Sequence, residues 1–165
     1  KIACMRYTYW VIDRLLAGRP GPTLYPWNPE ELYQAGLRVI VSLAAEEPVE
    51  DLEPYGFIHY RAAFPPVILY SEGMQKAFIH EALPVWAFIH EQLTAGNPTL
   101  VHCHAGQDRT GAILAGYLIV YQGVAPATAL RRLRSVKPTA LSAEGFADVL
   151  NLLTPGTLPD PRQLL

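Results

Sequence analysis

The stretch from Pro98 to Gly123, PTLVHCHAGQDRTGAILAGYLIVYQG, constrains the fold of this chain more than any other. It begins with a short apolar run that predicts a strand ending at the cysteine. A glycine-containing loop follows, and then a segment that is apolar around nearly its whole circumference. A helix of that kind lies buried at the centre of a fold. Other elements must therefore surround it.

The rest of the chain predicts an alternation of strands and helices around that unit. Tyr7–Gly18 is rich in aromatic and branched residues and predicts one or two short strands, while Leu37–Leu43 and Gly56–Ala62 predict two more. Helices are predicted from caps, prolines and terminal glycines over residues 29–36, 71–96 with a kink at Pro84, 125–136 and 142–153. Strands that alternate with helices imply an α/β fold, a single-domain three-layer sandwich whose central, mostly parallel β-sheet is flanked by helices.

Length and composition agree with one domain. The chain has 165 residues, of which 50% are hydrophobic, enough for one full core rather than two small ones. We expect the domain to cover residues 1–153. Residues 154–165, TPGTLPDPRQLL, contain three prolines and predict a proline-rich C-terminal tail that lies over the surface.

The net charge of −2 is low, so the chain lacks the electrostatic footprint of a protein that binds nucleic acid or an anionic membrane. No run of about eighteen apolar residues predicts stable membrane insertion, and no signal peptide opens the chain. The chain begins at Lys1 without a methionine. The completeness of the N-terminus therefore stays open, as does the oligomeric state.

The two cysteines, Cys4 and Cys103, lie far apart in the sequence. A disulfide framework is therefore not expected, and a reducing, cytoplasmic setting is expected instead. We expect Cys4 to be a packing residue rather than a redox partner of Cys103.

The sequence FIHE occurs twice in the long predicted helix, with histidines at His80 and His90. A zinc-binding His-Glu-x-x-His helix would need a histidine where Pro84 stands, and a ten-residue offset puts the two histidines on different faces. They are therefore interpreted as ordinary helix-surface residues, and no metal or other cofactor is expected.

The glycine-containing loop carries the chemistry. A strand that ends in such a loop and enters a helix directs several backbone N–H groups, and the positive end of the helix dipole, at one place, which binds an anion. A cysteine at the start of the loop has its thiolate stabilised and acts as a nucleophile at neutral pH. An arginine at its end presents a planar fork that grips two phosphate oxygens. Cys103 and Arg109 stand in these two places.

The segment HCHAGQDRTG resembles the His-Cys-x5-Arg-Ser/Thr signature of the cysteine-dependent protein tyrosine phosphatases. YWVIDRLLAGRPGP near the start, LRVIVSL, and ALRRLRSVKP after the central helix are similar to the small atypical dual-specificity phosphatases, so the resemblance covers residues 9–153. It implies hydrolysis of phosphomonoesters through a phosphocysteine intermediate, without a metal. It also implies a phosphorylated protein or a phosphoinositide as substrate.

Carried over residue by residue, the resemblance gives each position of the loop a role. Cys103 is the nucleophile, Arg109 clamps the phosphate, and Thr110 places its hydroxyl near the sulfur to stabilise the thiolate. His102 orders the loop through hydrogen bonds, and Gly111 permits close packing. The phosphate is expected to be bound by the turn itself, which consists of His104, Ala105, Gly106, Gln107, Asp108 and Arg109.

The chain departs from the family pattern in the general acid. These phosphatases usually carry an aspartate after the strand that corresponds to Gly56–Ala62, and here no aspartate occurs between Asp51 and Asp108. Asp108 is the leading candidate, because the GxDRT form of the loop resembles that of myotubularin-type and some bacterial lipid-directed phosphatases. The alternative is that Asp108 only stabilises the first helical turn or braces the loop. Glu72 is the next candidate, and Asp51 the third.

The substrate class stays open between two readings. Overall resemblance and length favour a dual-specificity protein phosphatase acting on phosphotyrosine and on phosphoserine or phosphothreonine. The QDRT loop points toward phosphoinositides, but Gln107 stands where a heavily phosphorylated inositol favours a lysine, and only His104 supplies extra charge nearby. The apolar segment FPPVILY, residues 64–70, is expected to be core, with a lid or a contact for a lipid or aromatic group as alternatives.

Two further classes are weaker alternatives. A pseudophosphatase, a module that binds phosphorylated partners without turnover, would explain the missing aspartate, but it has no need of Cys103, Arg109 and Thr110 together. Sulfur transfer or arsenate reduction by a similar loop lacks an evident resolving cysteine. The sequence therefore predicts a metal-independent cysteine phosphatase.

Overall fold

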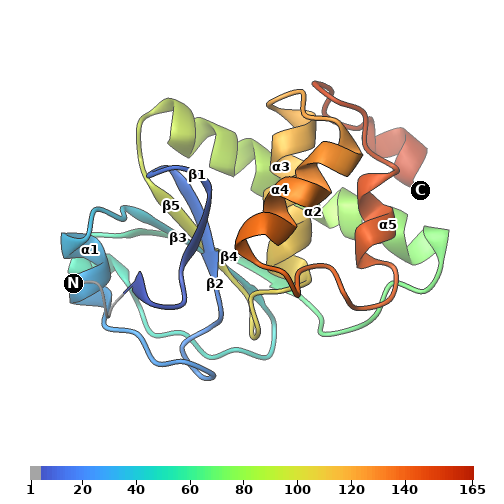
Figure 1. Ribbon diagram of the computed structural model, residues 1–165. Helices are drawn as coiled ribbons and strands as arrows, with labels where there is room; N and C mark the ends of the chain where they lie inside the picture. The colour runs from blue at the N-terminus through green and yellow to red at the C-terminus, as the bar shows by residue number, and fades with distance from the viewer. Residues whose placement is uncertain (1–4) are drawn as a thin grey trace.

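The computed structural model describes residues 5–165 and is built on one five-stranded sheet of order β1-β2-β5-β3-β4 (Figure 1). β1 pairs with β2 in antiparallel fashion, and the other neighbours are parallel. The mostly parallel sheet expected from the alternation of elements is therefore confirmed. The strands are β1 (Tyr9–Ile12), β2 (Leu16–Arg19), β3 (Val39–Ala44), β4 (Ile58–Phe64) and β5 (Thr99–His102).

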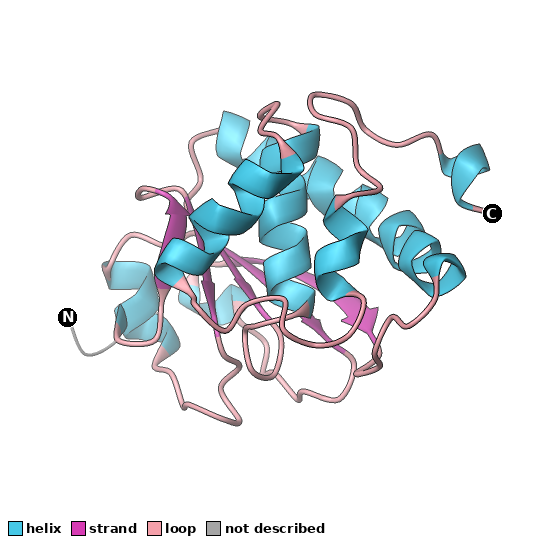
Figure 2. Ribbon diagram, turned by 45° about the vertical axis from the view of Figure 1, so that its right-hand side comes forward, coloured by secondary structure: helices cyan, strands magenta, loops and turns pink. Residues whose placement is uncertain are grey.

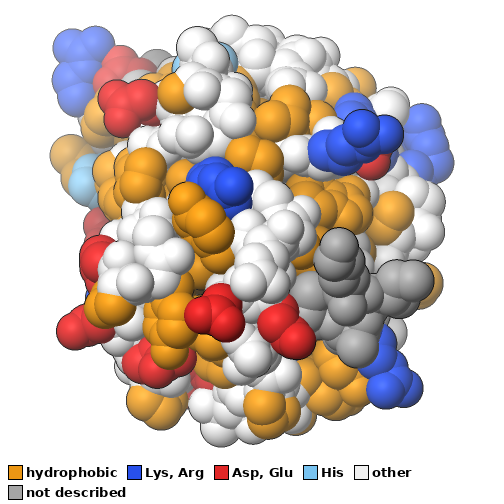
Figure 3. Space-filling view, turned by 90° about the vertical axis from the view of Figure 1, so that its left-hand side faces the viewer, with side chains coloured by type: hydrophobic (Ala, Val, Ile, Leu, Met, Phe, Trp, Pro, Cys, Tyr) orange, Lys and Arg blue, Asp and Glu red, His pale blue; other side chains and the backbone are white. Residues whose placement is uncertain are grey.

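Helices cover both faces of the sheet and complete the three-layer sandwich (Figures 1 and 2). One face carries α1 (Pro29–Gln34) and the short 3-10 helix η2 (Glu53–Tyr55). The other face is covered by the larger helical layer, which consists of α2 (Glu72–Thr94), α3 (Arg109–Val120), α4 (Pro126–Val136) and α5 (Phe146–Leu150). On the side of the molecule seen in Figure 3, acidic, basic and apolar side chains are interspersed.

Two hydrophobic cores lie on the two faces of the sheet. Because successive side chains of a strand point to opposite faces, Val39 and Val41 of β3 enter the larger core under α2 to α5, whereas Ile40 enters the smaller core with Leu32 of α1. Every residue of α3 is buried. This helix runs through the centre of the domain, as its apolar circumference predicts.

Local signals place the starts of α1 and α2 correctly. The Asn28 side chain accepts the Glu31 N–H at 3.2 Å, and the Ser71 hydroxyl accepts the Met74 N–H at 3.2 Å, so each caps its helix. Pro84 lies inside α2, and the helix runs without interruption from Glu72 to Thr94.

The helix predicted over residues 142–153 is wrong in its bounds, since α5 covers only Phe146–Leu150. Residues 141–145 instead form a turn whose backbone is engaged elsewhere. The Leu141 N–H donates to the Gln107 carbonyl at 3.1 Å, and the Glu144 carbonyl accepts the Leu69 N–H at 2.9 Å. Gly145, with φ of 86°, then sets the direction of α5. These long-range bonds replace the first turn of the expected helix.

The segment of residues 64–70 also departs from the expectation that it is core. Phe64 and Leu69 are buried, but Val67, Ile68 and Tyr70 are 46%, 47% and 66% exposed. The segment follows β4 at the edge of the sheet and connects it to α2. Apolar side chains of this segment therefore face solvent.

The end of the chain lies against the helical layer. The Gly156 N–H donates to the Ile119 carbonyl at 2.8 Å, and the 3-10 helix η3 (Pro161–Leu164) contacts α2. Cys4 lies outside the described residues. In residues 5–165, no helix is both long enough and apolar enough to cross a membrane.

Candidate active site

The carboxyl ends of the four parallel strands meet at one edge of the sheet, which is where ligands bind in open α/β sheets. The loop from Cys103 to Asp108 leaves β5 at that edge and enters α3 at Arg109. Cys103 is 2% exposed and has no disulfide partner. Cys103 is therefore a buried, unpaired cysteine in the loop between β5 and the N-terminus of α3.

The backbone carbonyls of the loop are hydrogen-bonded, three of them to distant segments of the chain, one to the ring of the preceding histidine and one within the first turn of α3. Five of its carbonyl groups accept hydrogen bonds: Cys103 from His102 Nδ1 (3.0 Å), His104 from the Gly21 N–H (2.9 Å), Gly106 from the Tyr9 hydroxyl (2.6 Å), Gln107 from the Leu141 N–H (3.1 Å) and Asp108 from the Ala112 N–H (2.8 Å). In a trans peptide the C=O and N–H bonds point in opposite directions, and the chain has no cis peptide in its described part. The amides that follow these carbonyls, from 104 to 109 except 106, are therefore directed to the inner side of the loop.

Gly106 makes the turn possible. Its φ is 71°, a left-handed conformation that L side chains rarely adopt, and a Cβ there would lie about 2.5 Å from the backbone of Arg19 and Pro20. The loop thus packs directly against the backbone that leaves β2. This is the reason that a glycine is required where the sequence has one.

Tyr9 anchors the loop by a side chain from the far edge of the sheet. Tyr9 is 7% exposed, and burial raises the pKa of its hydroxyl, so the group is an O–H donor at neutral pH. The Gly106 carbonyl that it binds belongs to the same peptide as the Gln107 N–H. The hydrogen bond therefore fixes the direction of one amide of the loop.

Replacing Tyr9 with phenylalanine is expected to weaken binding of inorganic phosphate roughly tenfold, because it leaves a buried carbonyl unpaired and frees one peptide to rotate. Isothermal titration of the purified chain with phosphate measures the effect. Tyr117→Phe is the matched control, since Tyr117 is 2% exposed and its hydroxyl lies 3.1 Å from His90 Nδ1, on the helices rather than the loop. Equal losses in both variants would contradict the role of Tyr9.

Arg109 is held by a bidentate ion pair that the sequence analysis missed. Its two terminal nitrogens donate to Glu46 Oε1 and Oε2 at 2.7 and 2.6 Å, and Nη1 also donates to the Phe64 carbonyl at 3.0 Å. Hydrogen bonds from the guanidinium lower the pKa of the Glu46 carboxyl. Of the five N–H donors of arginine, Nε–H and one N–H of Nη2 remain, and these form the other edge of the fork. That edge suits two oxygens of one phosphate.

Glu47 ties the same loop to a second segment. Its Oε1 lies 3.0 Å from His104 Nδ1, and its Oε2 accepts the Thr23 N–H at 2.7 Å. Burial alone would raise the pKa of Glu47, but the hydrogen bonds from Thr23 and His104 hold it below its usual value. The imidazole of His104 thus lies against a carboxylate, which offsets any positive charge that this ring brings to the loop.

A chain of hydrogen bonds crosses three strands behind the cysteine. Burial lowers the pKa of His102 to about 4, so its ring is neutral at neutral pH. Its Nδ1–H donates to the Cys103 carbonyl, and its Nε2 therefore accepts from the Ser42 hydroxyl at 2.6 Å. The Ser42 oxygen in turn accepts from His59 Nε2 at 2.8 Å. Each proton position follows from the one before it, and together they fix the orientation of His102.

Thr110 and Gly111 begin the buried helix. The Thr110 hydroxyl is fully buried and has no hydrogen-bond partner within residues 5–165. A Cβ on Gly111 would lie 3.0 Å from Leu141 and 3.3 Å from Leu133, so the absence of a side chain lets α3 pack closely against the turn at Leu141.

The three acid candidates differ in position. Asp108 lines a pocket of about 200 Å³ together with Arg109, and its Oδ1 accepts the Ala143 N–H at 3.2 Å. Glu72 is 66% exposed and pairs with Lys76 at 3.3 Å, and Asp51 is 86% exposed and lies 3.6 Å from Arg61. Asp108 therefore reaches the mouth of the loop and also braces it, whereas Glu72 and Asp51 lie outside this pocket.

Sequence reasoning missed the groups that support the loop from other strands and from the segment after β3: Tyr9, Ser42, Glu46, Glu47 and His59. The glutamates carried a usable signal, because they follow a buried strand and so come to the same edge of the sheet as Cys103. Tyr9 carried none, since 97 residues separate it from its partner. Within the described part of the chain, no three His, Cys, Asp or Glu side chains form a group that could hold a metal ion.

Residues 34–154 match the family described as "Dual specificity phosphatase, catalytic domain". The chain belongs to this family. The resemblance seen in the loop signature is thereby confirmed. The fold agrees, because the crystal structure of "Tk-PTP in the active form" superposes with a TM-score of 0.73 at 21% sequence identity, over 88% of this chain and 95% of that one.

The curated relatives include one named as a protein phosphatase and one named as a phospholipid phosphatase. "Dual specificity protein phosphatase 12" of Homo sapiens is 30% identical over 125 residues, which is 76% of this chain and 36% of that protein. "Phosphatidylglycerophosphate phosphatase PTPMT1" of Arabidopsis thaliana is 27% identical over 123 residues, or 74% of this chain and 36% of that protein. The chain thus spans about a third of the length of these relatives.

Proposed function

We propose that this chain hydrolyses phosphomonoesters through a phosphocysteine intermediate at Cys103, and that its substrates are proteins phosphorylated on tyrosine and on serine or threonine. The observation that carries the proposal is the anchored loop: five carbonyls held outward, and a guanidinium with one edge left for phosphate, around a buried cysteine. Family membership supports the same chemistry.

In the proposed reaction, the Cys103 thiolate attacks phosphorus and forms an S–P bond while the bond from phosphorus to the leaving oxygen breaks. The inward amides and the free edge of Arg109 bind the three peripheral oxygens and stabilise the charge that develops on them. The leaving oxygen takes a proton from Asp108. Water then attacks phosphorus, Asp108 takes up a proton from it, and inorganic phosphate leaves as the thiolate is restored.

Protein substrates are favoured over heavily phosphorylated inositols by the charge around the loop. Gln107 brings no charge, His104 lies on the carboxylate of Glu47, and one edge of Arg109 lies on Glu46. Additional phosphates would meet carboxylates rather than free cations there. A phospholipid with a single phosphomonoester is the second candidate, and the relative named as a phosphatidylglycerophosphate phosphatase favours it.

The activity is tested by hydrolysis of 4-nitrophenyl phosphate in the presence of EDTA, followed by rapid acid quench of the enzyme with a ³²P-labelled aryl phosphate. We expect turnover and a labelled peptide that contains Cys103. Turnover without a trapped label at Cys103, or dependence on a metal, contradicts the mechanism. The substrate class is tested by comparing phosphotyrosine and phosphothreonine peptides with phosphatidylglycerophosphate in mixed micelles.

Asp108→Asn is expected to lower kcat/KM by about 10²-fold or more on an alkyl phosphate, with little loss on 4-nitrophenyl phosphate, because only the poor leaving group needs a proton. Asparagine keeps an oxygen that accepts the Ala143 N–H, so the brace survives while the acid is removed. The basic limb of the pH–rate profile should flatten on the alkyl substrate. A small, equal loss on both substrates would instead make Asp108 a brace alone and direct the search to Glu72.

A further inference from the structure

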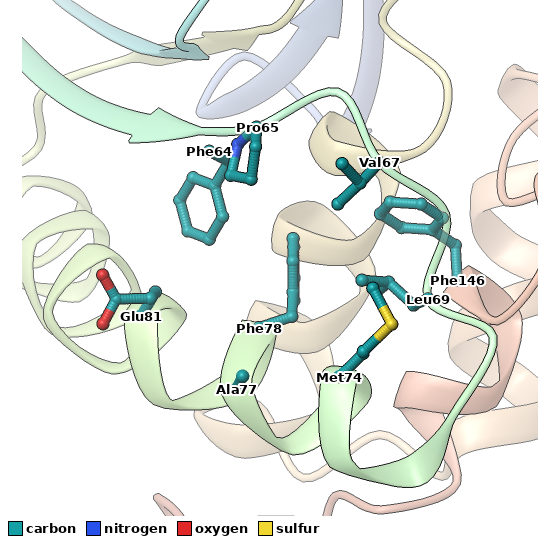
Figure 4. A pocket seen from close by; sticks show the side chains of 9 residues that line it. All are labelled: Phe64, Pro65, Val67, Leu69, Met74, Ala77, Phe78, Glu81 and Phe146. Atoms are coloured by element: carbon teal, nitrogen blue, oxygen red, sulfur yellow. The ribbon is translucent and has the colours of Figure 1, made fainter.

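A side pocket of about 200 Å³ lies next to the catalytic loop, between the segment that follows β4 and the first turns of α2 (Figure 4). Six large apolar side chains line it: Phe64, Val67, Leu69, Met74, Phe78 and Phe146. Glu81 stands at one end and is the one charged side chain among them. The pocket is thus suited to an apolar group.

The side pocket adjoins the pocket of the phosphate clamp. Val67 and Phe146 line both it and the pocket that contains Asp108 and Arg109. A molecule whose phosphate is bound in the loop therefore has an apolar surface immediately beside it. The two pockets together offer one charged and one apolar binding position.

The wall between the two pockets is exposed apolar surface. Val67 and Ile68 are 46% and 47% exposed, and the segment of residues 65–70 contains no ionisable side chain other than that of Tyr70. Contiguous exposed apolar surface at the mouth of a site favours a ligand that covers it. A ligand with only a phosphate would leave this surface in water.

Size and charge identify the ligand. A cavity of about 150 Å³ holds a benzene molecule, so the side pocket accepts one aromatic or branched side chain but not the paired chains of a phospholipid. Of the described side chains that line the two pockets, Arg109 is the one cation, and Glu46 occupies an edge of it. Anionic lipid surfaces are bound by clusters of Lys and Arg, which this rim lacks.

We propose that the side pocket is a specificity subsite, and that it binds one large apolar side chain of a protein segment whose phosphorylated residue occupies the loop of Cys103. The proposal rests on the function proposed above and adds to it the sequence preference. A phosphorylated segment with leucine or phenylalanine close to the phosphoresidue is then the favoured substrate, and small or acidic residues at that position are disfavoured.

The experiment compares phosphotyrosine peptides in an alanine background, with leucine or phenylalanine placed in turn at each of the three positions on either side. For the unmodified chain we expect at least one position where the large apolar residue raises kcat/KM about tenfold or more over alanine. If none of these peptides differs from the alanine peptide by more than about twofold, the subsite is refuted.

Two matched variants of α2 locate the effect. Ala77 is exposed and lines the side pocket, whereas Ala87 is exposed on the same helix and does not line it. Ala77→Phe is expected to fill the pocket, so that the peptide with the large apolar residue and the alanine peptide have about the same kcat/KM. Turnover of 4-nitrophenyl phosphate should be unchanged. Ala87→Phe is expected to keep the preference. Retention of the preference in Ala77→Phe overturns the assignment.

The remaining outcomes separate this proposal from the others. Faster turnover of phosphatidylglycerophosphate micelles than of every peptide, lost in Ala77→Phe, would assign the pocket to an acyl chain and contradict a protein segment. Absence of any 4-nitrophenyl phosphate hydrolysis by the unmodified chain would contradict the proposed function itself. Hydrolysis without a peptide preference contradicts the subsite alone.

Discussion

Replacing Cys103 with serine is expected to lower kcat/KM for 4-nitrophenyl phosphate by about 10⁵-fold or more, the scale of loss when a catalytic nucleophile is removed. A serine hydroxyl in this loop stays protonated and is a far weaker nucleophile than a thiolate. Phosphate affinity should change by no more than about threefold, because the inward amides and Arg109 remain. Steady-state kinetics and phosphate titration of the same preparation measure both quantities.

The other cysteine provides the control for this substitution. Cys4→Ser makes the same substitution at a cysteine 99 positions away in the sequence and is expected to leave kcat/KM unchanged. If Cys103→Ser kept more than about a hundredth of the activity, the nucleophile would have to be sought elsewhere. If it lost both activity and phosphate binding, the loop itself would have changed, and Cys103→Ala would be needed to separate the two effects.

Arg109→Lys is expected to lower kcat/KM by about 10³-fold, comparable to the removal of an oxyanion donor in other enzymes. Lysine keeps the positive charge but has one nitrogen, so it cannot bind both oxygens of Glu46 and still present a two-donor edge to phosphate. The loss should appear on good and poor leaving groups alike, because the clamp acts on the transferred group. Kinetics on both substrate types measures it.

Arg38→Lys is the matched control for the clamp. Arg38 Nη1 donates to the carbonyls of Tyr33 and Leu37, and the residue immediately precedes β3, at the end of the strand opposite to the loop. This variant should keep full activity with at most a small loss of stability. Near-native activity of Arg109→Lys would mean that charge alone suffices and that the donor geometry around Glu46 has no catalytic importance.

Much of the fold was readable from local patterns. The apolar circumference of residues 110–123 predicted a central helix, which the structure has as α3, and the apolar run at Leu37–Leu43 predicted a strand covered on both faces. Periodicity reports which faces of an element are covered, so it succeeds for regular elements. It failed at the start of the helix predicted over residues 142–153. The backbone conformation there is set by hydrogen bonds that join Leu141 to Gln107 and Glu144 to Leu69, and not by the apolar pattern.

The segment of residues 64–70 is a second place where a local pattern gave a wrong prediction. Its apolar composition predicted core, but the sheet ends at Phe64 and α2 begins at Glu72, so the short connection has no second layer to cover it. Composition measures how favourable burial would be. Whether a covering element is available depends on topology.

The sequence by itself determined the candidate reactive groups, a cysteine and an arginine six residues apart at the entry to a buried helix. Local backbone geometry favours anion binding at such a place. The tertiary structure alone decided what holds these groups. Tyr9 and Ser42 reach the loop from other strands and Glu46 from the segment after β3, and only the order β1-β2-β5-β3-β4 brings these residues to it. Local chemistry follows from neighbours in the chain, whereas hydrogen-bond partners distant in sequence are set by which strands the core brings together.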